Sequence, residues 1–245
     1  MLGHEQNGPC AGVKFRGQMR RTLAMIVTAA AAVTWPGPVS AQRPPDLSGN
    51  WIRGGGQVVF SQWEFTEEGG RRFKAYDFMK DDPGYGCIAS SWTRAWMNPN
   101  VLVRITQTAD GVRLQHEFMD IDRRVPLVDP AAANPKRSAL IPKMPSLGRS
   151  SAWYDGDALV IDTVGFPTGW LATMDKWAGL PQSPRMHTVE RLRRSGNALT
   201  IETTHVDPAY YRTAVVATIP YQKTDWELMH YGCDPKEAAV VAPTR

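Results

Sequence analysis

The chain has 245 residues, with 28 Lys and Arg against 24 Asp and Glu, and 42% of its residues are hydrophobic. That length suits one large domain or two small ones. Most of the basic excess lies in residues 1–41, and without Lys14, Arg16, Arg20, Arg21 and Glu5 the remainder holds 24 basic and 23 acidic residues. A nearly neutral chain argues against nucleic acid or an anionic membrane surface as the partner, because both require a basic field.

The first 41 residues have the pattern of a secretory signal peptide. Arg20 and Arg21 precede an apolar, Ala-rich run over 23–33 that is too short to span a bilayer as a helix. Small residues at 39–41 predict cleavage after Ala41, and the residues before Met19 look like an upstream extension. We therefore expect a removed segment, 1–41, and a single domain, 42–245, that is periplasmic or secreted, with no stable membrane insertion after cleavage. The alternative is an uncleaved anchor.

The cysteines predict one disulfide. Cys10 lies in the removed segment, which leaves Cys87 and Cys233. Two cysteines in an exported protein are most simply a disulfide, here tying an early loop to the last strand. A catalytic thiol is the competing interpretation, but no other feature points to either sulfur.

Strand signals then dominate the chain. Residues 46–52 predict the first strand, in which Gly49-x-Trp51 is similar to the start of lipocalin barrels. Thr66 predicts the cap of a short helix through Tyr76, and 80–100 look like a long ordered loop. Further strands are predicted at 57–62, 101–107, 112–119, 120–125, 149–154, 157–165, 187–193, 199–206, 213–221 and 226–231. Short strands with tight turns and almost no helix indicate a mainly β, antiparallel meander with one short helix.

A hairpin is predicted over 149–165. Asp155-Gly156 suits a two-residue type I′ turn, in which both residues need φ > 0. That register places Trp153 opposite Ala158 and Arg149 opposite Asp162. The face then carries an Arg–carboxylate pair beside a tryptophan, which suggests substrate binding, while the alternative is a surface ion pair of small energetic value.

Four sequence blocks match a known family. They are Asp46-Leu47-Ser48-Gly49-x-Trp51, Trp153-x-Asp155-Gly156-Asp157-x-Leu159-Val160-x-Asp162-Thr163-Val164-Gly165-Phe166, His187-x-Val189-Glu190-Arg191 and Trp226-Glu227-Leu228. Through them the chain resembles a large, mostly uncharacterised family of exported bacterial proteins, which implies a lipocalin-like β-barrel or a closely related sandwich. Arg149 stands where His is usual in that family, and His116 where an acidic residue is frequent, which suggests a specialised pocket.

Strand parity sorts the polar residues into inward and outward sets. His116 shares a face with Leu114 and Phe118, and His205 shares one with Ile201. His230 shares a face with Trp226. Three imidazoles are therefore predicted to point into one interior, although an inward His is more often a hydrogen-bonded core residue than a catalyst.

Glu190 is predicted to face inward if the turn near Ser195 has an even number of residues. That register pairs Leu192 with Leu199 and Glu190 with Ile201, whereas a three-residue loop slips the register by one. A carboxylate in apolar surroundings should have a raised pKa suited to acid–base work. The alternative is structural pairing of Glu190 with Arg123 or Arg191. His187 is a further catalytic candidate, supported mainly by the family resemblance.

No cofactor or metal is predicted. The sequence has no His-x-His, His-x-x-x-His or Cys-x-x-Cys spacing, although ligands from separate strands cannot be judged from one sequence. It also has no glycine-rich phosphate loop and no Gly-x-Ser-x-Gly elbow. Four tryptophans fall in predicted loops, where they either line the mouth of a pocket or pin the loops to the barrel: Trp92, Trp96, Trp170 and Trp177.

Two functions from different classes fit these patterns. The first is a periplasmic, cofactor-independent lyase, isomerase, hydratase or cyclase that acts on a small apolar or aromatic molecule in the barrel. In it, Glu190 or His116 carries the proton, Arg149 or Arg191 stabilises negative charge, Asp162 orients its partner and Trp170 closes the pocket. The second is a non-catalytic, lipocalin-like binding protein for hydrophobic ligands. A third option is a structural domain with a filled barrel. The remaining site candidates are His187 as a catalytic residue and Trp153 and His205 as substrate-binding residues.

Overall fold

The computed structural model describes residues 44–53, 56–134, 144–175, 177–234 and 236. The chain divides into two compact units, Met1–Ser40 and Ala41–Arg245, and only the second contains described residues. The predicted signal peptide and its cleavage site after Ala41 lie outside the described residues. No helix in the described ranges is both long and apolar enough to cross a membrane.

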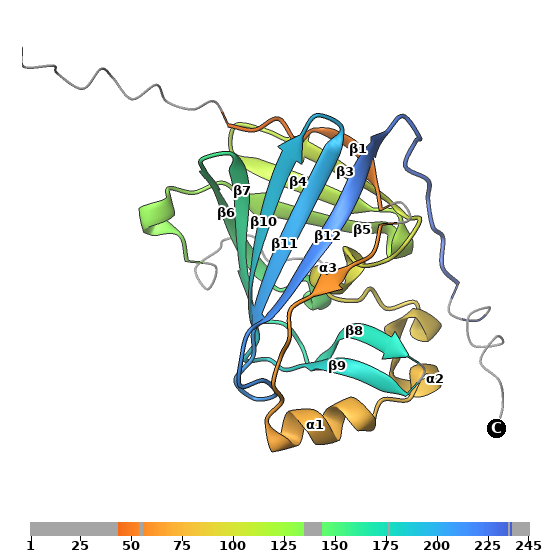
Figure 1. Ribbon diagram of the computed structural model, residues 1–245. Helices are drawn as coiled ribbons and strands as arrows, with labels where there is room; N and C mark the ends of the chain where they lie inside the picture. The colour runs from red at the N-terminus through yellow and green to blue at the C-terminus, as the bar shows by residue number, and fades with distance from the viewer. Residues whose placement is uncertain (1–43, 54–55, 135–143, 176, 235, 237–245) are drawn as a thin grey trace, which may run out of the picture. The chain divides into compact units, whose positions relative to one another are not determined.

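A ten-stranded antiparallel sheet wraps into a nearly closed barrel (Figure 1). Its strands are β1 (Gly49–Ile52), β2 (Val59–Phe60), β3 (Leu102–Gln107), β4 (Gly111–His116), β5 (Ile121–Pro126), β6 (Arg149–Asp155), β7 (Ala158–Val164), β10 (His187–Ser195), β11 (Ala198–Val206) and β12 (Val215–Thr224). The order is β5-β4-β3-β1-β12-β11-β10-β7-β6, with β2 paired to β12. Many successive strands, as in β3-β4-β5, β6-β7 and β10-β11-β12, are therefore neighbours, as expected for a meander.

The barrel closes where β5 meets β6. The backbone N–H of Val128 donates to the carbonyl of Ala152 over 2.8 Å, and Leu127 forms a parallel bridge with Ala152. At the other side, β1 lies between β3 and β12 and joins the N-terminal strands to the last strand. Closure leaves few unpaired strand edges, which protects the sheet from pairing with other chains.

The 149–165 hairpin forms, but its register differs from the prediction. Asp155 pairs with Ala158 and Arg149 with Val164, so the two-residue loop is Gly156-Asp157. Gly156 has φ +60°, whereas Asp157 does not have a positive φ. This pattern is that of a type II′ turn, which takes Gly at its first central position. The predicted type I′ turn is wrong, and because the slip is two residues, every side chain keeps its predicted face.

The β10–β11 hairpin shows the same two-residue slip. Leu192 pairs with Ile201 and Glu190 with Thr203, and Gly196 has φ +60°. The predicted Leu192–Leu199 and Glu190–Ile201 pairs are therefore wrong, while the even loop and the inward direction of Glu190 are confirmed. The register is set by Gly196, which takes the first position of the two-residue turn, and not by the pairing of Leu192 with Leu199.

The barrel interior is filled by large aromatic side chains. Trp92 and Trp96 belong to the short helix α3 (Trp92–Ala95) and its C-cap, and both are fully buried in the main core. Trp96 packs edge-on against Tyr221 of β12, and Trp92 packs edge-on against Trp96. These two tryptophans therefore form part of the core rather than a mouth. Trp51 is also fully buried there, and its Nε1–H donates to the carbonyl of Leu47 over 2.8 Å.

A second layer packs at one end of the barrel. It contains the expected helix α1 (Glu67–Lys74), a second short helix α2 (Phe78–Asp81), and a hairpin of β8 (Gly169–Asp175) with β9 (Ala178–Gln182) (Figure 1). Thr66 caps α1 as predicted, because its Oγ1 accepts from the N–H of Gly69 over 3.0 Å. The sequence predicted a loop where β8 and β9 form. This layer has its own apolar cluster, which includes Phe166, Leu171, Leu180, Met186 and Tyr211.

Short 3₁₀ helices connect several elements. They are η1 (Pro83–Gly86), η2 (Phe118–Asp120), η3 (Pro130–Ala132) and η5 (Pro145–Leu147). Of these, η1 lies in the predicted long loop, so the 80–100 segment contains the end of α2, then η1 and α3.

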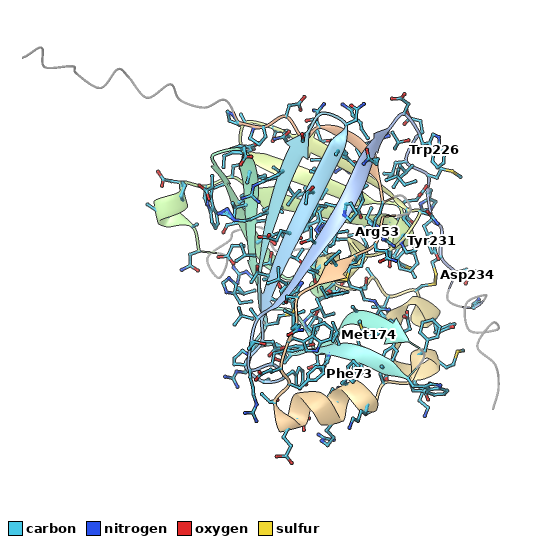
Figure 2. All side chains as sticks on the ribbon, in the orientation of Figure 1. Arg53, Phe73, Met174, Trp226, Tyr231 and Asp234 are labelled. Atoms are coloured by element: carbon cyan, nitrogen blue, oxygen red, sulfur yellow. A yellow bond between two sulfur atoms is a disulfide. The ribbon has the colours of Figure 1, made fainter. Side chains whose placement is uncertain are left out.

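The C-terminal segment runs along the outside of the barrel after β12. Residues 226–231 form no strand, and Trp226 and Tyr231 lie exposed along this segment (Figure 2). The Cys87–Cys233 disulfide forms as predicted, with the Cα atoms 5.7 Å apart, but it joins the η1 region to this segment and not to a strand. His230 is exposed and pairs with Asp120, so its predicted inward position is wrong.

Candidate functional site

A buried ion pair lies inside the barrel. The Arg123 guanidinium on β5 is 2.8 Å from the Glu190 carboxylate on β10, and both side chains are at most 3% exposed. Trp96 Nε1–H donates to Glu190 Oε1 over 2.6 Å. Arg123 also donates to the hydroxyls of Thr163 and Ser150, over 2.7 and 3.0 Å. Glu190 faces inward as predicted, but its surroundings are not apolar, because the predicted alternative of pairing with Arg123 is what forms.

His116 also faces the interior of the barrel. It is 1% exposed, and its ring packs edge-on against Trp92. Burial lowers the pKa of His116 to about 4, against the opposing effect of the Phe118 and Ala95 carbonyls. The imidazole is therefore neutral at pH 7, which suits a core residue as well as a base.

His205 is a hydrogen-bonded core residue. It is fully buried, and its ring nitrogens bond the hydroxyls of Thr188 and Thr203 over 3.0 and 2.9 Å. Burial lowers the pKa of His205 to about 3. With both nitrogens satisfied inside the barrel wall, the side chain has no remaining group to offer a ligand.

The expected site residues thus separate into an inner and an outer set. Glu190, His116 and His205 face the core and border neither of the two cavities that carry other expected residues. Trp153 and Arg191 lie on the outer face of the barrel, and Arg191 Nη1 donates to Asp155 over 2.9 Å. Because inner and outer residues are separated by the sheet, they cannot act on one molecule.

The outer set includes a cavity on the wall formed by β6, β7 and β10. We call it the outer-wall pocket; it measures about 750 Å³ and is bordered by Arg149, Asp162, Arg185, Met186 and His187, among others. The Nε2 of His187 lies 2.5 Å from Asp162 Oδ1. Arg149 lies diagonally across from Asp162 rather than directly opposite, because of the register slip. Three predicted site residues are therefore brought together, on the outside of the barrel.

A second cavity lies between α2, η1 and the start of β8. We call it the α2–β8 pocket; it measures about 630 Å³. Trp170 borders it, is 7% exposed, and packs edge-on against Tyr76. The Arg72 guanidinium stacks over the Trp170 ring, 4.8 Å from its centroid. Of the two tryptophans predicted to line a mouth from the 165–186 region, Trp170 is the one that borders a cavity, while Trp177 is exposed.

Buried polar atoms without partners line the α2–β8 pocket. Gln182 is 2% exposed and Ser90 is 6% exposed. Gln182 Nε2–H donates to the Pro167 carbonyl over 2.9 Å, which fixes the amide orientation, since only the nitrogen can donate. Gln182 Oε1, Ser90 Oγ and Arg72 Nε then have no hydrogen-bond partner. Such groups are rare in folded proteins, because leaving each one unpaired costs about 1–3 kcal/mol.

An ion-pair network supports one side of this pocket. Arg94 pairs with Asp82, which borders the cavity, and both side chains are only 12–13% exposed. Arg94 also donates to Thr173 Oγ1 over 3.0 Å, and the Tyr76 hydroxyl lies 3.0 Å from the same oxygen. The pKa of Tyr76 is raised, chiefly by burial. These contacts link η1, α3 and β8 and hold the pocket wall in place.

Sequence reasoning missed the residues that define this pocket. Arg72, Asp82, Ser90, Arg94 and Gln182 come from five separate elements or loops, so no motif spacing connects them. One local signal was present: Asp82 precedes Pro83-Gly84, which is typical of a turn, and in the structure its Oδ1 accepts from Gly84 N–H over 2.9 Å. This signal does not distinguish a pocket wall from an ordinary turn.

Among the described residues, no group of three or more His, Cys, Asp and Glu side chains could hold a metal ion.

Comparisons with known proteins give similarity to solved structures alone. No protein-family model matches the chain, and no curated protein matches it. A structure titled REP1-NXSQ fatty acid transporter has a TM-score of 0.34 and 9% identity, covering 74% of this chain and 98% of its own. The wild-type fluorescent protein UnaG has a TM-score of 0.30 and 12% identity, covering 73% of this chain and 97% of its own. At such low scores and identities, the likeness carries no argument about ligand or activity.

Proposed function

We propose that this protein binds a small, partly aromatic molecule in the α2–β8 pocket, as an exported carrier or sensor. The observation that carries the proposal is the set of unpartnered buried polar atoms on Gln182, Ser90 and Arg72 around a cavity of about 630 Å³. A ligand that pairs these atoms recovers the free energy lost by leaving them unpaired.

The chemistry of the pocket indicates the class of ligand. Trp170 offers a large apolar ring, part of which is covered by Arg72. Arg72 Nε–H requires an acceptor, Gln182 Oε1 requires a donor, and the Ser90 hydroxyl can serve as either. The ligand therefore combines a flat apolar body with at least one acceptor and one donor, as a phenol or a hydroxylated terpenoid does.

Binding is better supported than acid–base chemistry in the barrel. The proton carriers of that reaction were to be Glu190 or His116, and these side chains are held in the core by Arg123, Trp96 and Trp92. A general acid or base must come within hydrogen-bond reach of its substrate. Neither residue borders the α2–β8 pocket.

Export to the periplasm or the medium is part of the proposal. The Cys87–Cys233 disulfide supports it, because such bonds persist in oxidising compartments. The disulfide also lies close to the proposed site along the chain, since the neighbouring residues Gly86 and Ile88 border the α2–β8 pocket.

The experiment is a retention assay. Purified protein is incubated with pooled phenolic and terpenoid compounds, separated by gel filtration, and analysed by mass spectrometry for bound molecules. Each retained compound is then titrated against Gln182→Met, Ser90→Ala and Arg72→Met. We expect each substitution to weaken binding by about tenfold or more, because a hydrogen bond to the ligand is lost.

Gln222→Met is the matched control, since Gln222 is exposed on β12 and borders neither pocket. It should leave affinity unchanged. The proposal is overturned if no compound is retained, which is the result that a filled structural domain predicts. It is also overturned if the three pocket variants bind the retained compounds as tightly as the original protein does.

A further inference from the structure

The outer-wall pocket is independent of the proposed binding site. Its polar residues come from the outer faces of three neighbouring strands: Arg149 from β6, Asp162 from β7 and His187 from β10. Two further polar side chains come from loops: Arg185 before β10 and Asn134 after η3. The α2–β8 pocket shares none of these residues.

Positive charge predominates around this cavity. Among the described residues that border it, there are two guanidinium groups, on Arg149 and Arg185, and one carboxylate, on Asp162. That carboxylate is only 17% exposed and is bonded to the His187 ring over 2.5 Å. The Asp162 carboxylate therefore already has an imidazole partner in the pocket wall. The pocket is thus suited to an anion and not to a cation.

The loop that carries Arg185 is held rigidly. Asp207 is 1% exposed, and its carboxylate accepts from both the backbone N–H and the hydroxyl of Ser183, over 2.7 Å each. The Ser183 hydroxyl in turn accepts from the N–H of Arg185 over 3.0 Å. Met186 follows and is buried in the second apolar cluster. Because these contacts fix the backbone at Arg185, little backbone entropy is lost when Arg185 binds a ligand.

We propose that the outer-wall pocket is a binding site for a small oxyanion, a carboxylate or a phosphate, held by Arg149 and Arg185, with the His187 ring bordering the same cavity. A planar guanidinium can bond two oxygens of such a group at once, which makes arginine the preferred side chain for it. Asp162 is a positioning residue: it fixes the orientation of the His187 ring and does not itself contact the anion.

The test is calorimetric titration of the full protein with inorganic phosphate and, separately, with succinate. We expect one site per chain with a dissociation constant of about 1 mM or tighter at low ionic strength. Arg185→Met should weaken binding by about tenfold or more, because it removes a charge-assisted contact. The two probes distinguish a phosphate site from a carboxylate site.

Arg193→Met is the matched control, because Arg193 is exposed on the same strand, β10, and pairs with Asp157 away from the pocket. Asp162→Asn tests positioning: the site should remain, but chemical shifts of the His187 ring should change and lose their response to the anion. Binding weaker than about 10 mM for both probes, or equal binding in Arg185→Met and Arg193→Met, overturns the proposal.

Discussion

The guanidinium of Arg123 on β5 lies 2.8 Å from the carboxylate of Glu190 on β10, inside the barrel. The two strands are not direct neighbours, because β6 and β7 lie between them across the closure, so this pair links separate strands of the wall through the core. Trp96 adds a third contact, from α3 to Glu190. The three side chains therefore connect β5 and β10 to α3, which lies in the core.

Breaking this pair should be costly. We expect Arg123→Met to lower the free energy of unfolding by about 3–5 kcal/mol, because it leaves the Glu190 charge buried without its partner. Urea unfolding followed by tryptophan fluorescence measures the change. In the double variant Arg123→Met with Glu190→Leu, most of that loss should be recovered, because no charge is then buried. A double variant no more stable than the single one would contradict this account.

Acid should destabilise the fold through two histidines. Burial lowers the pKa of His116 to about 4 and that of His205 to about 3, from an ordinary value of 6.5. Below about pH 6.5, the unfolded chain therefore binds more protons than the native protein. Above that pH, the two histidines do not lower the free energy of unfolding. This free energy falls as the pH drops toward 4, by at most about 1.4 kcal/mol per pH unit for each histidine.

Urea unfolding at a series of pH values from 7 to about 4.5 measures this slope. His116→Gln removes one of the two groups, so it should reduce the slope without abolishing it. The idea fails if the slope is the same in His116→Gln as in the original protein.

The disulfide should stabilise both the fold and the C-terminal segment. It closes a separation of 146 residues. We expect Cys87→Ser with Cys233→Ser to lower the free energy of unfolding by about 2–4 kcal/mol, since long closed loops restrict the unfolded chain most. Limited proteolysis should then cut near Tyr231 sooner than in the oxidised protein. Equal proteolysis rates would show that the contacts of Asp120 with this segment suffice to hold it.

Two adjacent glycines in α1 should respond differently to alanine. A Cβ at Gly69 would lie 1.9 Å from the Tyr210 carbonyl oxygen, so the helix would have to move from the chain segment it packs against. Gly69→Ala should therefore destabilise the protein by about 1–3 kcal/mol. At Gly70 the nearest contact is Phe65 Cβ at 3.9 Å, so Gly70→Ala should be neutral or stabilise by up to about 1 kcal/mol. Thermal unfolding compares the two variants, and equal shifts would contradict the packing account.

Much of the fold could be predicted from local pattern. The alternation of apolar residues located most of the barrel strands, and Thr66 located the start of α1. Strand parity placed His116, His205 and Glu190 inside correctly. The pattern failed for 226–231, which has alternating residues but no partner strand, and for β8 and β9, whose sequence contains Gly179 and Pro181 and lacks a clear alternation.

The exact pairing of strands was decided by turn geometry. Gly156 and Gly196 each occupy the first position of a two-residue loop with φ +60°, and this shifts both registers by two residues. A shift of two changes which residues face each other but not which face they occupy. Hence Arg149 is diagonal to Asp162, while the inward position of Glu190 is unaffected.

The sequence alone therefore determined the class of fold, the disulfide and the inward direction of His116, His205 and Glu190, because these depend on period-two alternation and on composition. Only the tertiary structure decided that Trp92 and Trp96 fill the barrel, that Arg123 meets Glu190, and that Gln182, Ser90 and Arg72 border one cavity. These relationships join residues that are far apart in the chain, and one sequence carries no information on such distances until the strands are closed around the core.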